Sequence, residues 1–204
     1  GTVQKGRSKV RTIAQVAMLG AVATVLMLFE FPIPFLAPPF YELDFSEVPV
    51  LIGAFAMGPI AGIAIEAVKI LLNFVLNGTI TAGVGEIANF LVGCAFLLPA
   101  ALVYRKKKTR KHAILGMIAG TVVMTTVACV LNAWILLPAY GIAFGMPVET
   151  FVEMGTAING AIDSLFTFAL LAVGPFNLLK GLLVSGIVLL LYKRIRVILR
   201  GDYS

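Results

Sequence analysis

The run Arg105-Lys106-Lys107-Lys108-Thr109-Arg110-Lys111 separates two apolar stretches, residues 84–104 and 113–138, each long enough to cross a bilayer. Two further basic clusters lie near the two ends of the sequence, and the three clusters together hold fourteen of the sixteen Lys and Arg residues. The outer two clusters are Lys5, Arg7, Lys9 and Arg11, and Lys193, Arg194, Arg196 and Arg200. Because Lys and Arg accumulate in cytoplasmic loops, all three clusters are predicted to lie on the cytoplasmic side. The number of crossings between neighbouring clusters must then be even.

The composition predicts an integral membrane protein. Of the 204 residues, 60% are hydrophobic and 13% are charged, and the mean hydropathy is +1.01. Soluble domains average about 45–50% apolar and about 25% charged residues. The chain has room for roughly five to seven spans of about 20 residues and leaves little for a soluble domain, which excludes a separate catalytic or nucleotide-binding domain. Nucleic acid is therefore not expected as the partner of the net charge of +6. We expect a single domain, residues 1–204, without a removable signal peptide.

The even number of crossings decides the ambiguous segments. The apolar run 48–76 must cross twice or not at all, and a helix break is expected at Gly58-Pro59, because the residue before a proline avoids helical geometry. The predicted fold is an all-α integral membrane protein with six transmembrane helices and both termini in the cytoplasm. Two outer segments remain, 30–46 and 139–174, in which 141–160 is predicted to be a loop and 162–173 a helix against the outer end of the bundle. The expected spans are about 12–29, 47–58, 59–77, 84–104, 113–138 and 175–193.

The residues of most enzyme sites are missing, so we predict that the protein is not an enzyme. No G-x-x-x-x-G-K-[ST] motif occurs, so uphill transport would need an ion gradient or another subunit. His112 is the only histidine and lies in a basic loop, which argues against H-E-x-x-H zinc chemistry and a Ser-His nucleophile. Glu66 is the only acid well inside a span. It lies three residues before Lys69, so it either pairs with that lysine or acts as a proton or ion relay.

Polar side chains gather at one predicted depth, close to the outer surface. Asn177 and Lys180 lie one helical turn apart after Pro175, and Asn132 lies near the outer end of the preceding span. Asn89 and Glu86 occupy the same depth on the fourth helix. Because a polar side chain in lipid is costly, these residues should face the inside of the bundle. Asparagines that only bridge helices are the simpler interpretation of each one taken singly.

The segment 31–41, FPIPFLAPPFY, is too rich in proline to form a helix. It predicts a stiff apolar lid over a shallow pocket, although an interfacial aromatic belt would have a similar composition. A pocket lined by amides and one ammonium beneath such a lid suits a flat, partly apolar ligand with an amide-like edge.

Two motifs resemble a known family. The stretch YELDFSEVPVLIGAFAMGP at 41–59, followed by Gly62, Glu66, Lys69 and Asn73, is similar to the substrate-binding S components of energy-coupling-factor (ECF) vitamin transporters. Asn132 together with PFNLLKG at 175–181 resembles the riboflavin-binding members of that family. The resemblance implies a prokaryotic plasma-membrane complex with a transmembrane scaffold subunit and two cytoplasmic ATPases. It also implies that Asn132, Asn177 and Lys180 contact the flavin and that the loop 30–46 acts as its gate.

The chemistry of a flavin agrees with these residues. Its pyrimidine edge carries an N–H between two carbonyls, which Asn132 and Asn177 can match, and Lys180 can serve a carbonyl or a ribityl hydroxyl. No arginine cluster of the kind that binds phosphate is present, so riboflavin is favoured over its phosphate FMN, which one lysine does not exclude. The ring faces and the dimethylbenzene end of the flavin are expected to contact Phe40, Tyr41, Leu43 and Trp134.

The first predicted helix contains a candidate docking site for a partner protein. Ala17 and Ala21 form a small-residue pair that lets another helix approach closely, and in the family such a motif docks the S component onto the scaffold subunit. Two other functions stay open at this point: an S component for another vitamin, and a small ion-coupled carrier that uses Glu66 and Lys69.

Overall fold

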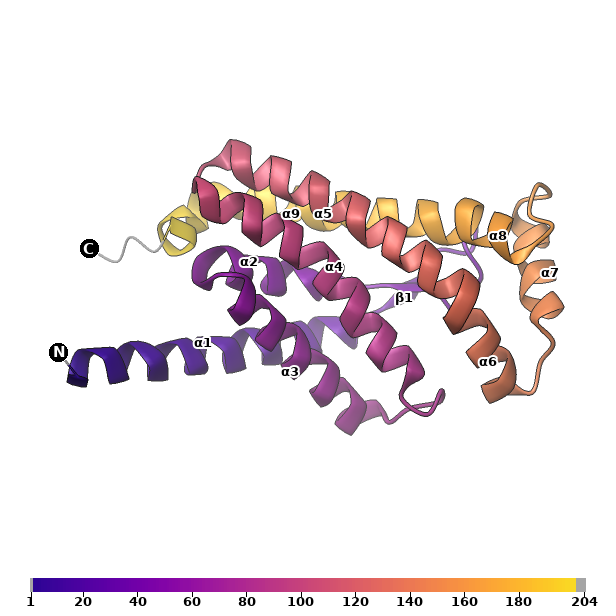
Figure 1. Ribbon diagram of the computed structural model, residues 1–204, viewed down its shortest axis with the longest axis horizontal. Helices are drawn as coiled ribbons and strands as arrows, with labels where there is room; N and C mark the ends of the chain where they lie inside the picture. The colour runs from indigo at the N-terminus through magenta and orange to yellow at the C-terminus, as the bar shows by residue number, and fades with distance from the viewer. Residues whose placement is uncertain (1, 201–204) are drawn as a thin grey trace.

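The helices of the protein run side by side along one long axis (Figure 1). The computed structural model describes residues 2–200 and the side chains of residues 9–196. A two-stranded antiparallel hairpin, with Phe31 opposite Leu43, forms within the segment that joins the first two helices. The elements are α1 (Thr2–Met27), β1 (Phe31–Pro32), β2 (Glu42–Leu43), α2 (Glu47–Met57), α3 (Pro59–Asn77), α4 (Val84–Lys106), α5 (Arg110–Leu131), the π-helical turn η1 (Asn132–Leu136), α6 (Leu137–Phe144), α7 (Val148–Ile158), α8 (Leu165–Phe168), the π-helical turn η2 (Ala169–Val173) and α9 (Gly174–Arg200).

Several of these helices are long and apolar enough to cross a membrane. Within the described residues there are five such segments, and α2 is a shorter apolar helix. Large apolar side chains such as Ile60 and Leu190, each 82% exposed, cover the outward faces of the bundle. Such a surface would be a liability in water and is suited to lipid. The five segments are Lys9–Met27, Pro59–Asn77, Val84–Lys106, Arg110–Phe144 and Leu165–Arg196.

The helix break predicted at Gly58-Pro59 is confirmed. Gly58 has a φ of +99°, a backbone conformation that side chains other than glycine's disfavour, and Pro59 occupies the first turn of α3. The sharp turn folds α2 and α3 back on one another, and their junction lies toward the same end of the molecule as the chain termini (Figure 1).

The prediction for residues 139–174 was wrong in two respects. Residues 148–158 form a helix, α7, where a loop was expected, and residues 165–173 continue directly into α9 instead of forming a separate helix. Likewise, α5 runs through η1 into α6 and beyond Pro138. In both long helices a π-helical turn ends two residues before a proline, at Pro138 and Pro175. A π turn adds one residue to the helix, which makes room for a proline ring that would otherwise crowd the preceding turn.

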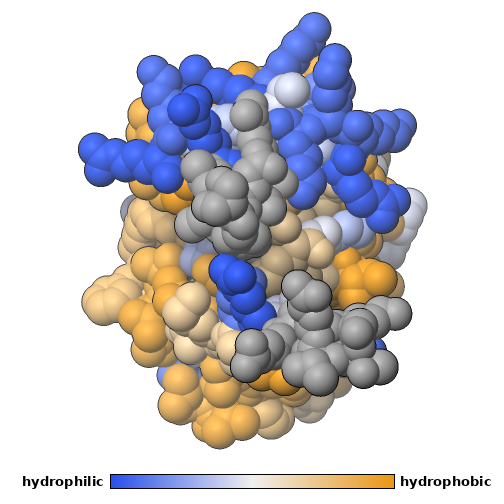
Figure 2. All heavy atoms as spheres, turned by 90° about the vertical axis from the view of Figure 1, so that its left-hand side faces the viewer, coloured by the Kyte–Doolittle hydropathy of each residue, from blue (hydrophilic) through white to orange (hydrophobic). Residues whose placement is uncertain are grey.

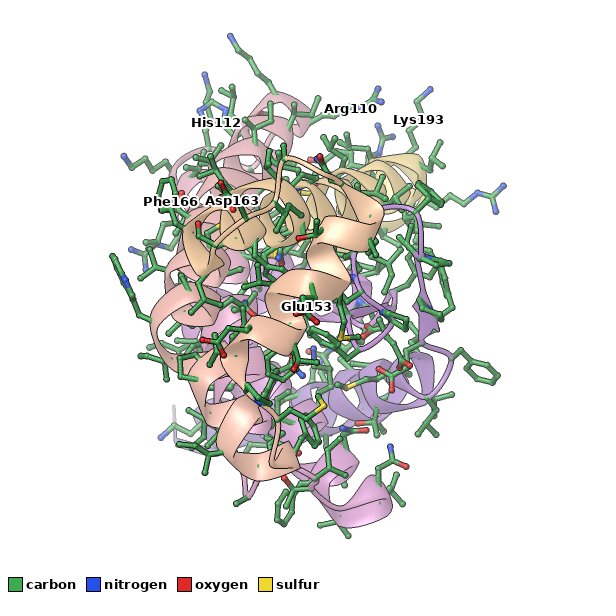
Figure 3. The ribbon with its side chains drawn as sticks, turned by 90° about the vertical axis from the view of Figure 1, so that its right-hand side faces the viewer. Arg110, His112, Glu153, Asp163, Phe166 and Lys193 are labelled. Atoms are coloured by element: carbon green, nitrogen blue, oxygen red, sulfur yellow. The ribbon has the colours of Figure 1, made fainter. Side chains whose placement is uncertain are left out.

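The basic clusters lie at one end of the bundle. The N-terminal part of α1, the α4–α5 turn and the C-terminal part of α9 all lie at the left of Figure 1. Figure 2 views this end and shows hydrophilic residues gathered over its upper part, with apolar residues below them. Lys5, Arg7 and Arg200 lie outside the described side chains. Figure 3 views the opposite end, where α7 and its Glu153 lie across the bundle.

The main core lies between α2, α4, α5 and α9. The rings of Phe55 and Tyr104 pack with centroids 4.6 Å apart, and Phe96, Met117 and Val184 are fully buried beside them. This core occupies the half of the bundle toward the basic end and leaves the other half to the site described next.

Candidate ligand-binding site

A cavity of about 380 Å³ lies beneath the segment that joins α1 to α2. Its walls come from α4, from the continuous helix α5–η1–α6 and from the start of α9, toward the end of the bundle opposite the basic clusters (Figure 1). Ligand cavities typically measure about 300–1,000 Å³. The lining residues are Met27, Glu30, Phe40, Tyr41, Glu42, Asp44, Ile80, Gly85, Ala88, Asn89, Val92, Ala128, Asn132, Leu136, Tyr140, Phe176, Asn177 and Lys180.

Two asparagines enter the cavity from the two helices that carry π-helical turns. Asn132 Nδ2 donates to the carbonyl oxygen of Ala128 at 2.8 Å, and Asn177 Nδ2 donates to that of Val173 at 2.9 Å. Both side chains are buried, and each Nδ2 keeps a second proton. Among the described side chains none donates to Asn177 Oδ1. The pair therefore presents amide donors and a free amide acceptor to a ligand.

Aromatic rings of the segment 30–46 cover the cavity. Tyr41 donates its hydroxyl proton to Asn132 Oδ1 at 2.5 Å, and its ring lies 5.8 Å from that of Phe176 and 6.2 Å from that of Phe168. Phe40 meets the ring of Phe151 on α7 edge-on at 5.6 Å. Burial raises the pKa of Tyr41 well above its ordinary value, so this hydroxyl stays a neutral donor. The segment is thus a cover packed against α7 and α9, as its composition predicted.

Lys180 faces Asp44 within the cavity. Burial by itself would raise the pKa of Asp44, but the positive charges of Lys180 and Lys69 and the hydrogen bond from the Ser46 N–H, 2.7 Å long, outweigh it and lower the pKa. Asp44 is therefore a buried carboxylate held ionised by two ammonium groups.

A second pair of acids lies at the edge of the cavity, where α1 ends and β2 begins. Burial, a hydrogen bond with Glu42, and the negative charges of Glu42 and Asp44 raise the pKa of Glu30 to about 7. Together with Asp44 these acids give the lid side of the cavity a negative character. The sequence analysis missed all three because their spacing along the chain shows no common face.

The cavity brings together six of the nine side chains predicted for the ligand site: Asn132, Asn177, Lys180, Tyr41, Phe40 and Asn89.

The other three lie elsewhere, and their assignment is corrected. Trp134 is 71% exposed and lines an outward groove with Phe166, because residues two apart on a helix do not share a face and Asn132 faces the cavity. Leu43 is buried on the inner side of the lid segment against Phe176. Glu86 lies in the first turn of α4, where it accepts a hydrogen bond from the Thr79 hydroxyl at 3.0 Å.

A buried ion cluster, defined here as Glu47, Lys69 and Glu66, lies beyond the cavity wall. Lys69 Nζ lies 2.7 Å from Glu47 Oε1 and 2.8 Å from Glu66 Oε1, and it donates to Ser46 Oγ at 3.1 Å. Each member is at most 3% exposed. The predicted pairing of Glu66 with Lys69 is confirmed, and the structure adds Glu47 from the start of α2, which the sequence analysis did not connect with this pair.

The fold and the cavity define a helical membrane protein with a polar-lined cavity toward the end opposite its basic residues. The chain belongs to the substrate-specific components of ECF transporters, because residues 11–192 match that family. The members of this family are transport proteins and not enzymes. The several apolar helices of this chain agree with a multi-pass membrane protein.

Named relatives and a solved structure agree with this family. The riboflavin transporter RibU of Staphylococcus aureus (strain TCH60) is 39% identical over 185 residues, which cover 91% of this chain and 90% of the relative. The riboflavin transporter FmnP of Bacillus subtilis (strain 168) is 34% identical over 189 residues, which cover 92% and 93%. A solved S component of a bacterial ECF transporter superposes with a TM-score of 0.73 at 38% identity, covering 92% of this chain and 96% of that one.

Proposed function

We propose that this chain captures riboflavin in the cavity beneath the lid and serves as the substrate-binding subunit of an ECF transporter. The observation that carries the proposal is the pair of asparagine amides beside Lys180 under an aromatic cover, in a chain whose relatives are named riboflavin transporters. An amide can donate to a flavin carbonyl and accept from the flavin N–H, and Asn177 keeps one Nδ2 proton and its Oδ1 for these two bonds. The rings of Tyr41 and Phe176 supply apolar faces for the isoalloxazine.

Uncharged riboflavin is the preferred ligand over its phosphate. Lys180 is the single cation among the lining side chains, while three carboxylates share the cavity with it. A phosphate brings two negative charges that one ammonium, already beside Asp44, does not balance. We expect FMN to bind more weakly.

In the proposed topology the chain crosses the membrane six times, and α2 and α3 are two of the crossings. Both termini and the α4–α5 turn then lie in the cytoplasm of a prokaryotic cell. The gathering of basic residues at one end supports it, since cytoplasmic loops are rich in Lys and Arg. The cavity then opens toward the outer face of the plasma membrane, where a nutrient arrives.

The proposed partners are a transmembrane scaffold subunit and two cytoplasmic ATPases. Ala17 and Ala21 lie on an exposed face of α1, and Ala17 borders a shallow apolar groove between α1 and α3. Small side chains there allow a helix of the scaffold to approach closely. ATP hydrolysis by the partners would drive delivery of the vitamin inward.

Titration of the detergent-purified chain with riboflavin, followed through the ligand's fluorescence, tests the ligand assignment. We expect stoichiometric quenching at submicromolar riboflavin and weaker quenching with FMN. Absence of quenching with riboflavin, together with binding of another vitamin, would reassign the substrate within the same family.

A further inference from the structure

The buried ion cluster adjoins the ligand cavity without lining it, and a short path of polar contacts connects the two. We propose that Lys69 is a positioning residue for the ligand site: its ammonium, fixed on α3, holds the C-terminal end of the segment 30–46 against the bundle and so places Asp44 and the lid. The assignment of a ligand to this cavity rests on the proposed function, whereas the tether itself does not.

The path consists of contacts between fully buried groups. Lys69 Nζ donates to Ser46 Oγ at 3.1 Å and to Glu47 Oε1 at 2.7 Å, and the Ser46 N–H donates to Asp44 Oδ1 at 2.7 Å. Asp44, which lines the cavity, is 5% exposed, and Ser46 is completely buried. The end of the lid segment is therefore bonded to a side chain of α3 and is shielded from water that could replace those bonds.

The Ser46 side chain bonds to Lys69 instead of capping α2. Ser46 is the residue before α2, and serine in this position usually accepts a hydrogen bond from the N–H groups of the first turn. Its hydroxyl makes no such bond and instead accepts from Lys69. The side chain thus joins α2 and the lid to α3.

The ammonium has little freedom to move away. Glu66 packs so closely against Gly93 of α4 that a Cβ at position 93 would lie 2.3 Å from Glu66 Oε1. Glu66 in turn holds Lys69 at 2.8 Å. Because an unpaired buried ion is strongly unfavourable, Lys69 stays between its two carboxylates, and the position of the tether is set by the packing of α3 on α4.

Two attachments constrain the lid segment. The β1–β2 pairing joins the two ends of the segment to each other, and the Lys69–Ser46 bond joins its C-terminal end to α3. Phe40 and Tyr41 lie in the loop that the pairing closes, Asp44 lies between β2 and Ser46, and all three line the cavity. Loss of the second attachment should let this stretch open more often, which speeds ligand release more than it slows capture.

Ser46→Ala is the decisive variant, because it removes the bond from Lys69 to Ser46 and leaves every charge, and the bond from Lys69 to Glu47, in place. In the ligand-free protein, we expect amide hydrogen exchange of residues 41–46 to become about five- to tenfold faster, the effect of one lost hydrogen bond. In stopped-flow fluorescence, the dissociation rate of riboflavin should rise by a similar factor while the association rate stays within twofold. Lys69→Met should give larger effects of the same sign.

Thr121→Val is the matched control. Thr121 is also a buried hydroxyl, bonded to the Met117 carbonyl oxygen at 2.8 Å within α5, and has no bond to the lid. It should lower the melting temperature without changing exchange at 41–46 or the dissociation rate. If Lys69→Met does not fold, Ser46→Ala decides alone. Unchanged exchange at 41–46 in Ser46→Ala would overturn the Lys69–Ser46 tether, whereas a wild-type protein that binds no riboflavin would overturn the proposed function instead.

Discussion

Replacing Asn177 with alanine tests the ligand site most directly. The side chain is 7% exposed, its Oδ1 accepts no hydrogen bond from the described side chains, and one Nδ2 proton is left after the bond to Val173. In Asn177→Ala the flavin edge loses a donor and an acceptor in the cavity beneath the lid. An unpaired buried polar group costs about 1–3 kcal/mol, which corresponds to about a 5- to 150-fold weaker Kd. Fluorescence titration with riboflavin measures this loss.

Two variants separate the amide's chemistry from its volume. Asn177→Leu keeps a side chain of similar size without the amide, so it should bind as weakly as Asn177→Ala. Asn73→Ala removes an asparagine on α3 that accepts a hydrogen bond from Asn77 at 2.8 Å and does not line the cavity, so it should bind like the wild type. The reasoning is refuted if the Kd of Asn177→Ala stays within twofold of the wild-type value, or if Asn177→Leu restores it.

Four further predictions follow from particular contacts. Lys180→Ala should weaken riboflavin binding by about 1–3 kcal/mol in the same titration, and should also raise the pKa of the cavity carboxylate that it faces. The pKa of Glu30 is raised from 4.5 to about 7, so the folded protein keeps a proton that the unfolded chain loses. Stability should therefore fall as the pH rises through this window, and melting curves from pH 5 to 8 should show a smaller fall for Glu30→Gln. Ala17→Leu should leave the Kd for riboflavin unchanged and reduce co-purification with the scaffold subunit; normal co-purification would remove that docking site. Gly93→Ala, whose Cβ would collide with Glu66, should lower the melting temperature, with a cost of about 1–3 kcal/mol, and an unchanged melting temperature would show that α3 and α4 can separate there.

The helical architecture could be predicted because it depends on local properties of the chain. Long apolar runs bounded by basic residues mark helices that require lipid. Gly58-Pro59 marks a helix break, because the conformation of each residue is restricted by its own covalent structure. The pairing of Glu66 with Lys69 follows in the same way from helical spacing.

The continuous helices through Pro138 and Pro175 could not be predicted by the same rules. A proline ordinarily ends a helix, and the two π-helical turns that accommodate the prolines have no sequence signal that we recognise. Trp134, in contrast, could have been placed from spacing alone: it is two residues from Asn132, which faces the cavity, and residues two apart on a helix do not share a face.

The amino-acid sequence alone determines the chemical character of this protein: a lipid-embedded helical bundle, a proline-rich aromatic cover, and amides with one ammonium at a common depth. Each of these follows from residue type and from spacing within one helix. The contacts between segments became visible only in the folded molecule. Glu30, Glu42 and Asp44 meet because the hairpin returns to the end of α1, and Glu47 joins Lys69 because α2 folds back on α3 at Gly58. A charge buried between helices needs partners from other helices, and which helix supplies them is decided by how the whole bundle packs.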